Sequence, residues 1–240
     1  MKARLGVTRI DSSTLSKRVL MQLRDRIIGG AVAGETWLRL ADLADELGTS
    51  ITPVRTALAE LETQGLVAVA KARGYRVVPP TDADIRDAYL VIGFLSGELS
   101  ARAAARADDA FVEHLVRLEK AVIAADRSGS SEAVDAANWE FHRWINLRAA
   151  APRLALELRT LTHSVPHDFH GIVSGWTELA IKHHRKLVAA IAGRDPLRAR
   201  TAAEKHVELG RTHLLQHLAD LREAKSAQRA APAPQKRKPT

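Results

Sequence analysis

Three histidines and one asparagine have the residue types and the spacing of a metal site. Asn138 and His142 are four residues apart, which puts them about one turn apart on the same face of a helix. His184 and His206 fall in two later segments with helical patterns. Imidazoles that converge inside a helical bundle can bind zinc, nickel, iron or manganese, with positions left open for a carboxylate ligand. The alternative is that these are buried histidines with ordinary hydrogen-bond partners.

A second group of candidate residues lies nearer the N-terminus, and its chemistry suits DNA recognition. Short hydroxyl side chains can reach phosphates, and an arginine can reach either a phosphate or the edge of a guanine. A later basic turn around Lys71 adds further candidates. The candidate DNA-binding residues are Ser50, Thr52, Pro53, Arg55, Thr56, Arg73 and Tyr75.

The segment that holds these residues has the pattern of a winged helix-turn-helix. The expected elements are helices over Ser13–Ile28, Leu40–Leu47 and from Thr49 or Ser50 to about Gln64, then strands over 66–69 and 75–78. The second and third helices are separated by Gly48-Thr49-Ser50, and the third can lie in a major groove. The two strands form a small β-hairpin wing, with 71–74 as its turn.

After the stiff break at Pro79-Pro80 the pattern is helical almost throughout. The expected helices cover 82–106, 108–127, 131–149, 152–164, 175–193 and 195–223. The predicted fold is therefore mainly α, with an N-terminal winged helix-turn-helix and a C-terminal all-α bundle. The predicted domains are a flexible N-terminus over 1–12, a DNA-binding domain over 13–80, an effector-binding and dimerisation domain over 81–224, and a basic disordered tail over 225–240.

Composition and charge support a DNA-binding protein with a separate second task. The chain has 240 residues, no cysteine and a net charge of +8, so disulfides and thiolate metal sites are excluded. Positive charge is in excess in residues 1–80 and 225–240, whereas the long middle is nearly balanced. The N-terminus lacks the apolar run of a signal peptide, and no segment approaches the roughly 20 apolar residues of a membrane span. We expect a cytoplasmic protein with no membrane partner.

The N-terminal pattern resembles the GntR family of bacterial regulators, whose signature is similar to LAxxLGVSRxPVRxALxxLxxxGLV. The matching stretch here runs from Leu43 to Leu58, followed by Leu61 and Gly65-Leu66-Val67. The resemblance implies that Arg55 contacts DNA. Ile51 and Ala41 stand where the family usually has DNA-contacting arginines, which implies weaker phosphate anchoring or an unusual operator.

The C-terminal segment resembles the all-helical FCD ligand-binding domain of the FadR-like branch of that family. Residues 138–142, 151–154 and 184–191 resemble D-x-x-F-H, N-P-x-L and H-x-x-I-x-x-A-I, and Asp195, Ala199 and His206 keep a further spacing. Related proteins commonly have aspartate where this chain has Asn138, so the resemblance implies a weaker divalent metal site for zinc, nickel or manganese.

The resemblance also bears on the small-molecule effector. Ile92 and Ser96 look like the positions where the family often has an arginine and a glutamate, which implies an effector less acidic or more apolar than usual. Arg102 and Arg143 are candidate effector-binding residues that could replace that arginine. The effector class we expect is a small metabolite, an organic acid.

The leading hypothesis is a homodimeric transcriptional repressor that binds double-stranded operator DNA and responds to this metabolite. One alternative is an architectural DNA-binding protein without an effector. The other is a metal-dependent enzyme, but the sequence shows no placed general base, no Gly-rich phosphate loop and no nucleophile elbow. We therefore predict that the protein is not an enzyme.

Overall fold

The computed structural model of the protein describes residues 12–70, 73–162, 165–166, 173 and 175–230. It divides into two compact units, with the main division between Asp84 and Ile85. The expected boundary lay slightly earlier, after Pro80, and the functional limits of the domains stay a prediction. The predicted N-terminal segment and the last ten residues lie outside the described residues, apart from the start of the first helix.

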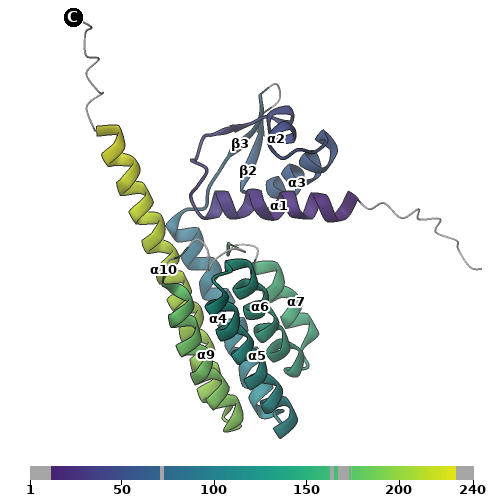
Figure 1. The fold of residues 1–240 in the computed structure, drawn as a ribbon, viewed down its shortest axis with the longest axis vertical. Helices are drawn as coiled ribbons and strands as arrows, with labels where there is room; N and C mark the ends of the chain where they lie inside the picture. The colour runs from purple at the N-terminus through teal and green to yellow at the C-terminus, as the bar shows by residue number, and fades with distance from the viewer. Residues whose placement is uncertain (1–11, 71–72, 163–164, 167–172, 174, 231–240) are drawn as a thin grey trace, which may run out of the picture. The chain divides into compact units, whose positions relative to one another are not determined.

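The first unit is a winged helix-turn-helix. Its elements are α1 (Ser12–Ile28), β1 (Trp37–Leu38), α2 (Leu40–Glu46), α3 (Ile51–Thr63), β2 (Val67–Ala70) and β3 (Gly74–Val77) (Figure 1). The strands form one antiparallel sheet in the order β1-β3-β2. The sequence predicted only the hairpin of β2 and β3, because the two residues of β1 are too few to show an alternating pattern.

The first unit holds α3 in place with an apolar core and one buried arginine. Helix α1 packs against α3, and the helices contribute buried side chains at helical spacing. These buried residues are Val19, Leu23, Ile27 and Ile28 of α1 and Val54, Ala57, Leu58 and Leu61 of α3. Arg24 is also buried, and its Nε donates a hydrogen bond of 3.1 Å to Oε1 of Gln64. The buried side chains on the inner face of α3 therefore fix the position of the helix and of its outer face.

Gly74 allows strand β1 to pair closely with β3 of the hairpin. Its φ of +96° is a backbone conformation that residues with a Cβ rarely adopt. A Cβ on Gly74 would also lie 2.5 Å from the carbonyl oxygen of Leu38 in β1. Any other residue at this position would push β1 away from β3.

The second unit contains helices and no strand among its described residues. Its elements are α4 (Asp82–Ala105), α5 (Asp109–Ser128), α6 (Ser131–Arg148), α7 (Pro152–Leu161), α9 (Trp176–Ala192) and α10 (Pro196–Ala230). Figure 1 shows the long helices α4, α5, α6, α9 and α10 running roughly along one axis. Helix α5 packs against α6 and α9, and α9 packs against α10. Phe141, Leu115 and Ile191 are fully buried in the shared core.

Helix ends in this unit follow local signals in the sequence. The carboxylate of Asp108 caps α5 by accepting a hydrogen bond of 2.8 Å from the backbone N–H of Phe111. Ser130 caps α6 in the same way, through the N–H of Ala133. Gly129, which ends α5, has a φ of +73°. These caps explain why the predicted helix limits agree with the structure at this junction.

Helix α10 is longer than the sequence predicted. It continues to Ala230, whereas the expected helix ended near residue 223 and residues 225–240 were expected to be disordered. The prediction was wrong for residues 225–230. The physical reason is that Ala, Lys, Gln and Arg are strong helix formers, so a helix can continue without an apolar stripe. Residues 225–227 are exposed.

None of the described helices is both long and apolar enough to cross a membrane.

Candidate functional site

The outer face of α3 presents most of the predicted DNA-binding residues to solvent. Ser50 is the N-cap of this helix, and its backbone is extended. Thr52, Arg55 and Thr56 are exposed, and the hydroxyl of Thr56 donates to the carbonyl oxygen of Thr52 over 3.1 Å. Apart from the exposed Ile51, the face is thus polar and basic in its first two turns and carries no acidic group there. It has the shape and chemistry of a helix that enters a major groove.

Pro53 is the exception among the predicted residues of α3. Its side chain is buried with Val54 on the inner face, which does not favour a side-chain contact with DNA, and its role in DNA binding stays a prediction. Proline is tolerated in the first turn of a helix because its missing N–H has no helical partner there. Pro53 therefore shapes the start of the helix from inside.

The wing carries a cation and an aromatic ring side by side. The guanidinium carbon of Arg73 lies 5.9 Å from the ring centroid of Trp37 in β1, a cation–π geometry. Arg73 is exposed and Tyr75 is half-buried in β3. The predicted wing residue Lys71 lies outside the described residues. We did not single out Trp37 from the sequence, although a large aromatic residue in the link between the first two predicted helices, which contains Gly29, Gly30 and Gly34, was a usable signal.

The three predicted histidines meet inside the second unit. Each offers a ring nitrogen, and these atoms from His142, His184 and His206 all lie within 4.8 Å of one another. His184 is fully buried, His206 is 8% exposed, and His142 is half-buried. Their ring centroids are 4.9–5.1 Å apart. Three helices that are distant in the chain, α6, α9 and α10, thus bring three imidazoles together.

The apolar stripes of these helices decide which histidines point inward. On α9, Ile181, Leu187 and Val188 are buried with His184, whereas the neighbouring His183 is only half-buried. On α10, His206 continues the buried line of Ala199 and Ala203. The ring of His184 also stacks on Phe141 with a centroid distance of 4.3 Å.

Asn138 lies one turn before His142 on α6, as the spacing predicted. Its Oδ1 atom is buried and accepts no hydrogen bond from the described residues. A buried carbonyl oxygen without a donor is costly unless a ligand or water pairs with it. A metal ion would pair with this oxygen, as expected if Asn138 is the fourth metal ligand.

Two aromatic residues near the cluster were not predicted. Trp176 is 5% exposed, and its ring centroid lies 5.5 Å from that of His206 and 5.7 Å from that of His213. Tyr89 of α4 is 5% exposed, its hydroxyl has no partner among the described residues, and burial raises the pKa of that hydroxyl. A Cβ on Gly210 would lie 3.5 Å from Trp176 and 3.6 Å from Tyr89, in ordinary van der Waals contact, so both rings pack close to α10 at this position.

The predicted effector residues Arg102 and Arg143 lie on the surface of the domain. Arg102 is exposed, and its Nε lies 2.7 Å from Oε1 of Glu98 one turn earlier. Arg143 is exposed over the ring of Trp139 and pairs with Glu140 over 3.0 Å. Their positions give no support to a role at the histidine cluster.

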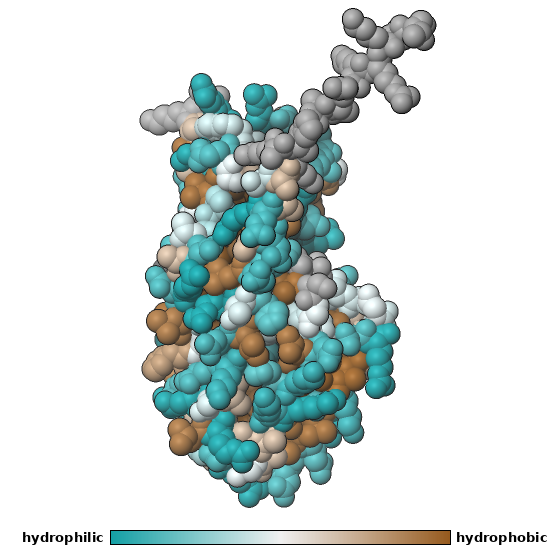
Figure 2. All heavy atoms as spheres, turned by 90° about the vertical axis from the view of Figure 1, so that its left-hand side faces the viewer, coloured by the Kyte–Doolittle hydropathy of each residue, from teal (hydrophilic) through white to brown (hydrophobic). Residues whose placement is uncertain are grey.

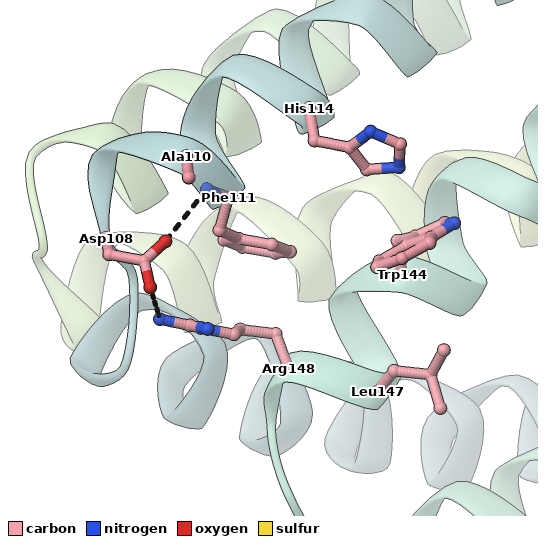
Figure 3. A pocket seen from close by; sticks show the side chains of 7 residues that line it. All are labelled: Asp108, Ala110, Phe111, His114, Trp144, Leu147 and Arg148. Atoms are coloured by element: carbon pink, nitrogen blue, oxygen red, sulfur yellow. Dashed lines mark hydrogen bonds and ion pairs between the residues drawn. The ribbon is translucent and has the colours of Figure 1, made fainter.

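A surface hollow lies between α5 and α6, apart from the histidines (Figure 3). Its volume is about 440 Å³, and it is lined by Asp108, Ala110, Phe111, His114, Trp144, Leu147 and Arg148. Nη2 of Arg148 lies 2.6 Å from the helix-capping Asp108, and its guanidinium lies over Phe111. Arg148 and Asp108, at one end of the hollow, thus pair with each other and hold α5 against α6.

Together the fold and these two sites define a two-domain protein with a DNA-reading helix and a helical domain that can hold a ligand. Residues 15–77 match the family described as "Bacterial regulatory proteins, gntR family". Residues 87–209, slightly over half of the chain, match the FCD domain. The chain therefore belongs to the GntR family of bacterial regulators that carry an FCD domain. It is a DNA-binding transcriptional regulator whose FCD domain makes it responsive to a small metabolite.

Curated relatives have the same organisation. An "Uncharacterized HTH-type transcriptional regulator" of Mycobacterium tuberculosis is 29% identical over 193 residues, which is 80% of this chain and 78% of the relative. A "Probable D-xylose utilization operon transcriptional repressor" of Paenarthrobacter nicotinovorans is 28% identical over 200 residues, 79% of this chain and 85% of the relative. The HTH-type transcriptional repressor GlaR of Escherichia coli is 25% identical, over 77% of this chain and 89% of the relative.

A solved structure supports the fold. The Escherichia coli protein McbR/YncC is similar with a TM-score of 0.65 and 23% identity, covering 84% of this chain and 97% of that one. At this identity the likeness shows the arrangement of helices and strands alone.

Proposed function

We propose that this regulator is a homodimeric repressor that acts in the cytoplasm on a palindromic operator. It would read DNA with Ser50, Thr52, Arg55 and Thr56 of α3 and with Arg73 and Tyr75 of the wing. The exposed polar face of α3 and the names of two curated relatives as repressors support this proposal. A symmetric operator follows because each chain carries one recognition helix, and a two-fold dimer presents two in equivalent orientations.

A second copy also suits the surface of the helical unit. Figure 2 shows hydrophobic groups among hydrophilic ones on the face that it presents. Residues 90–95 of α4 are apolar on both sides: Ile92 and Leu95 are buried, whereas Leu90 and Phe94 are 68% and 62% exposed. A stretch of helix that is apolar all round is normally covered on every side. Sedimentation of wild type and of Phe94→Glu tests this point, since a charged side chain in the interface should produce monomers.

We further propose that His142, His184 and His206 hold a divalent metal, with Asn138 as a fourth, neutral ligand. The convergence of three imidazole nitrogens within 4.8 Å is the observation that carries this proposal. Two nitrogens bound to one zinc at about 2.0–2.1 Å lie roughly 3.3 Å apart in a tetrahedral site, so the rings need only close slightly. Oδ1 of Asn138, which has no hydrogen-bond partner among the described residues, also fits the metal, because an amide carbonyl oxygen can coordinate a divalent ion.

The metal would supply a positive centre for the effector. Four neutral protein ligands leave its full charge in place, and this charge would attract the carboxylate of an organic acid. Such a ligand would link α6, α9 and α10, and it could shift how the two DNA-binding units of a dimer are held. DNA affinity changes only if the effector binds the DNA-competent and DNA-incompetent states with different affinity.

The test starts with selection of bound duplexes from a random DNA pool by the full chain. Selection is repeated after chelation, and again with zinc plus candidate organic acids. We expect one enriched palindrome and an acid that reduces its binding only when metal is present. Enrichment of no sequence would refute the operator proposal. A palindrome that no acid and no metal affects would leave a DNA-binding protein and refute the sensor.

A further inference from the structure

The first residue of the recognition helix is an exposed isoleucine. Ile51 directly follows the N-cap Ser50, and its side chain is 43% exposed. It lies four residues before Arg55, so the two side chains share the outer face of α3 about one turn apart. Both therefore belong to the surface that we propose enters the major groove.

Ile51 has no evident role within its own unit. The inner face of α3 is already filled by Val54, Ala57 and Leu58, which are 0–1% exposed. Isoleucine is also a weaker helix former than many polar residues, so propensity does not favour it at an outer position. A single exposed apolar residue is common on protein surfaces and needs no special account. What distinguishes Ile51 is its place on the DNA-reading face beside Thr52 and Arg55.

We infer that Ile51 determines sequence specificity by packing on the 5-methyl group of a thymine in the major groove. The inference rests on the proposed operator binding. Thymine alone among the four bases presents a methyl group in that groove, and apolar side chains recognise it by contact. The side chain of Ile51 has no donor for a guanine or a phosphate, so a thymine is the base whose edge it complements.

The helix geometry limits where this thymine lies. Four residues of an α-helix span about 6 Å along the axis. Base pairs are stacked about 3.4 Å apart, so 6 Å corresponds to about two base-pair steps. The thymine should therefore lie within about two base pairs of the base or phosphate that Arg55 contacts, once in each half-site.

The experiment replaces each thymine of the selected operator by deoxyuridine, which removes only the 5-methyl group. Affinity of the full chain for each duplex is measured by fluorescence anisotropy at one salt concentration. We expect one thymine per half-site to be sensitive. Its replacement should weaken binding about fourfold, the factor for one buried methylene, and about fifteenfold when both half-sites are changed. Ile51→Ala should bind the thymine and uridine duplexes equally, whereas Ile51→Val should retain part of the preference.

Val78→Ala is the matched control, because Val78 is an exposed aliphatic residue of the same unit that lies outside α3. It should keep the wild-type ratio. The inference is overturned if no uridine weakens wild-type binding, if the half-site holds no thymine near the Arg55 contact, or if Ile51→Ala keeps the fourfold ratio. These outcomes leave operator binding intact, whereas a selection that enriches no sequence refutes the proposed function itself.

Discussion

The two candidate sites are built in opposite ways. The residues that we propose read DNA, Ser50, Thr52, Arg55 and Thr56, lie within one short stretch and are exposed. The three histidines come from three helices and lie inside the bundle. An exposed residue costs the fold little, so its type reflects the partner that it meets outside. A buried imidazole needs partners within the fold, so its presence reflects what the interior binds.

This difference also explains which departures from the family pattern each site tolerates. At the exposed site, Ile51 and Ala41 replace arginines, and both positions remain solvent-exposed without any effect on the core. At the buried site, Asn138 stands where related proteins commonly have an acid, and its Oδ1 has no hydrogen-bond partner within the part of the chain that the structure describes. A substitution at the outer site changes what is recognised, and one at the inner site also changes the stability of the domain.

The largest expected effect concerns salt and separates the two sites. Between about 50 and 200 mM salt, operator affinity should fall by a factor of about 10³ or more if six or more phosphates are contacted. Metal binding to buried imidazoles should change little over this range, since burial limits screening. Anisotropy of labelled operator and calorimetric metal titration measure both quantities. Operator affinity that is independent of salt would contradict the placement of the basic residues at phosphates.

Metal removal is expected to have the next largest effect, and only on the inner site. Metal at about 100 times its dissociation constant should stabilise the protein by about 2.7 kcal/mol, which raises Tm by roughly 5–10 °C. His184→Ala should abolish this response to zinc, nickel or manganese. His183→Ala is the matched control and should retain it, because His183 is the half-buried neighbour outside the cluster. Wild type that holds no metal and gains no stability from any of the three ions would exclude the metal centre.

Arg55→Ala should affect only the outer site. We expect operator affinity to fall by about 1–3 kcal/mol, roughly 5- to 150-fold, if Arg55 reads a base. The melting temperature should stay unchanged because the side chain is exposed. Glu62→Ala, at the exposed far end of the same helix, is the control and should bind as wild type. Intact operator affinity in Arg55→Ala would mean that α3 is not placed in the groove as proposed.

Asn138→Asp should raise the metal affinity of the inner site, because it supplies a charged ligand. A carboxylate should bind the metal more tightly than an amide, on the order of tenfold. Asn146→Asp, which introduces the same charge two turns later on α6, should have no such effect. Metal titration by calorimetry measures both variants. Equal affinity of Asn138→Asp and wild type would place residue 138 outside the metal shell.

Deletion of residues 225–240 should have the smallest effect on stability. The segment carries five basic residues and no acidic one. Non-specific DNA binding should weaken moderately, because fewer counterions are released, while Tm should change little. Thermal melts and anisotropy with random duplex DNA measure the two effects. A large loss of Tm would show that the end of α10 packs against another part of the protein.

Local patterns in the sequence were sufficient for most of the fold. Helix limits such as those at Asp108 and Ser130 depend on caps between residues three apart, so they are visible in the chain itself. The winged helix-turn-helix follows from apolar spacing around Gly48 and Gly65. The extension of α10 to Ala230 was missed because composition without an apolar stripe was taken as a sign of disorder, although its residues favour helix.

The sequence by itself determined the order of elements, the exposed polar face of α3 and the residues that could bind metal. These depend on spacing along one helix and on residue chemistry. Only the tertiary structure decided that Pro53 faces inward, that His142, His184 and His206 lie close enough to share one ion, and that β1 completes the sheet. These facts depend on which face of each element is buried by a distant part of the chain. A one-residue shift along a helix turns a side chain by about 100°, and only packing against neighbouring elements settles that rotation.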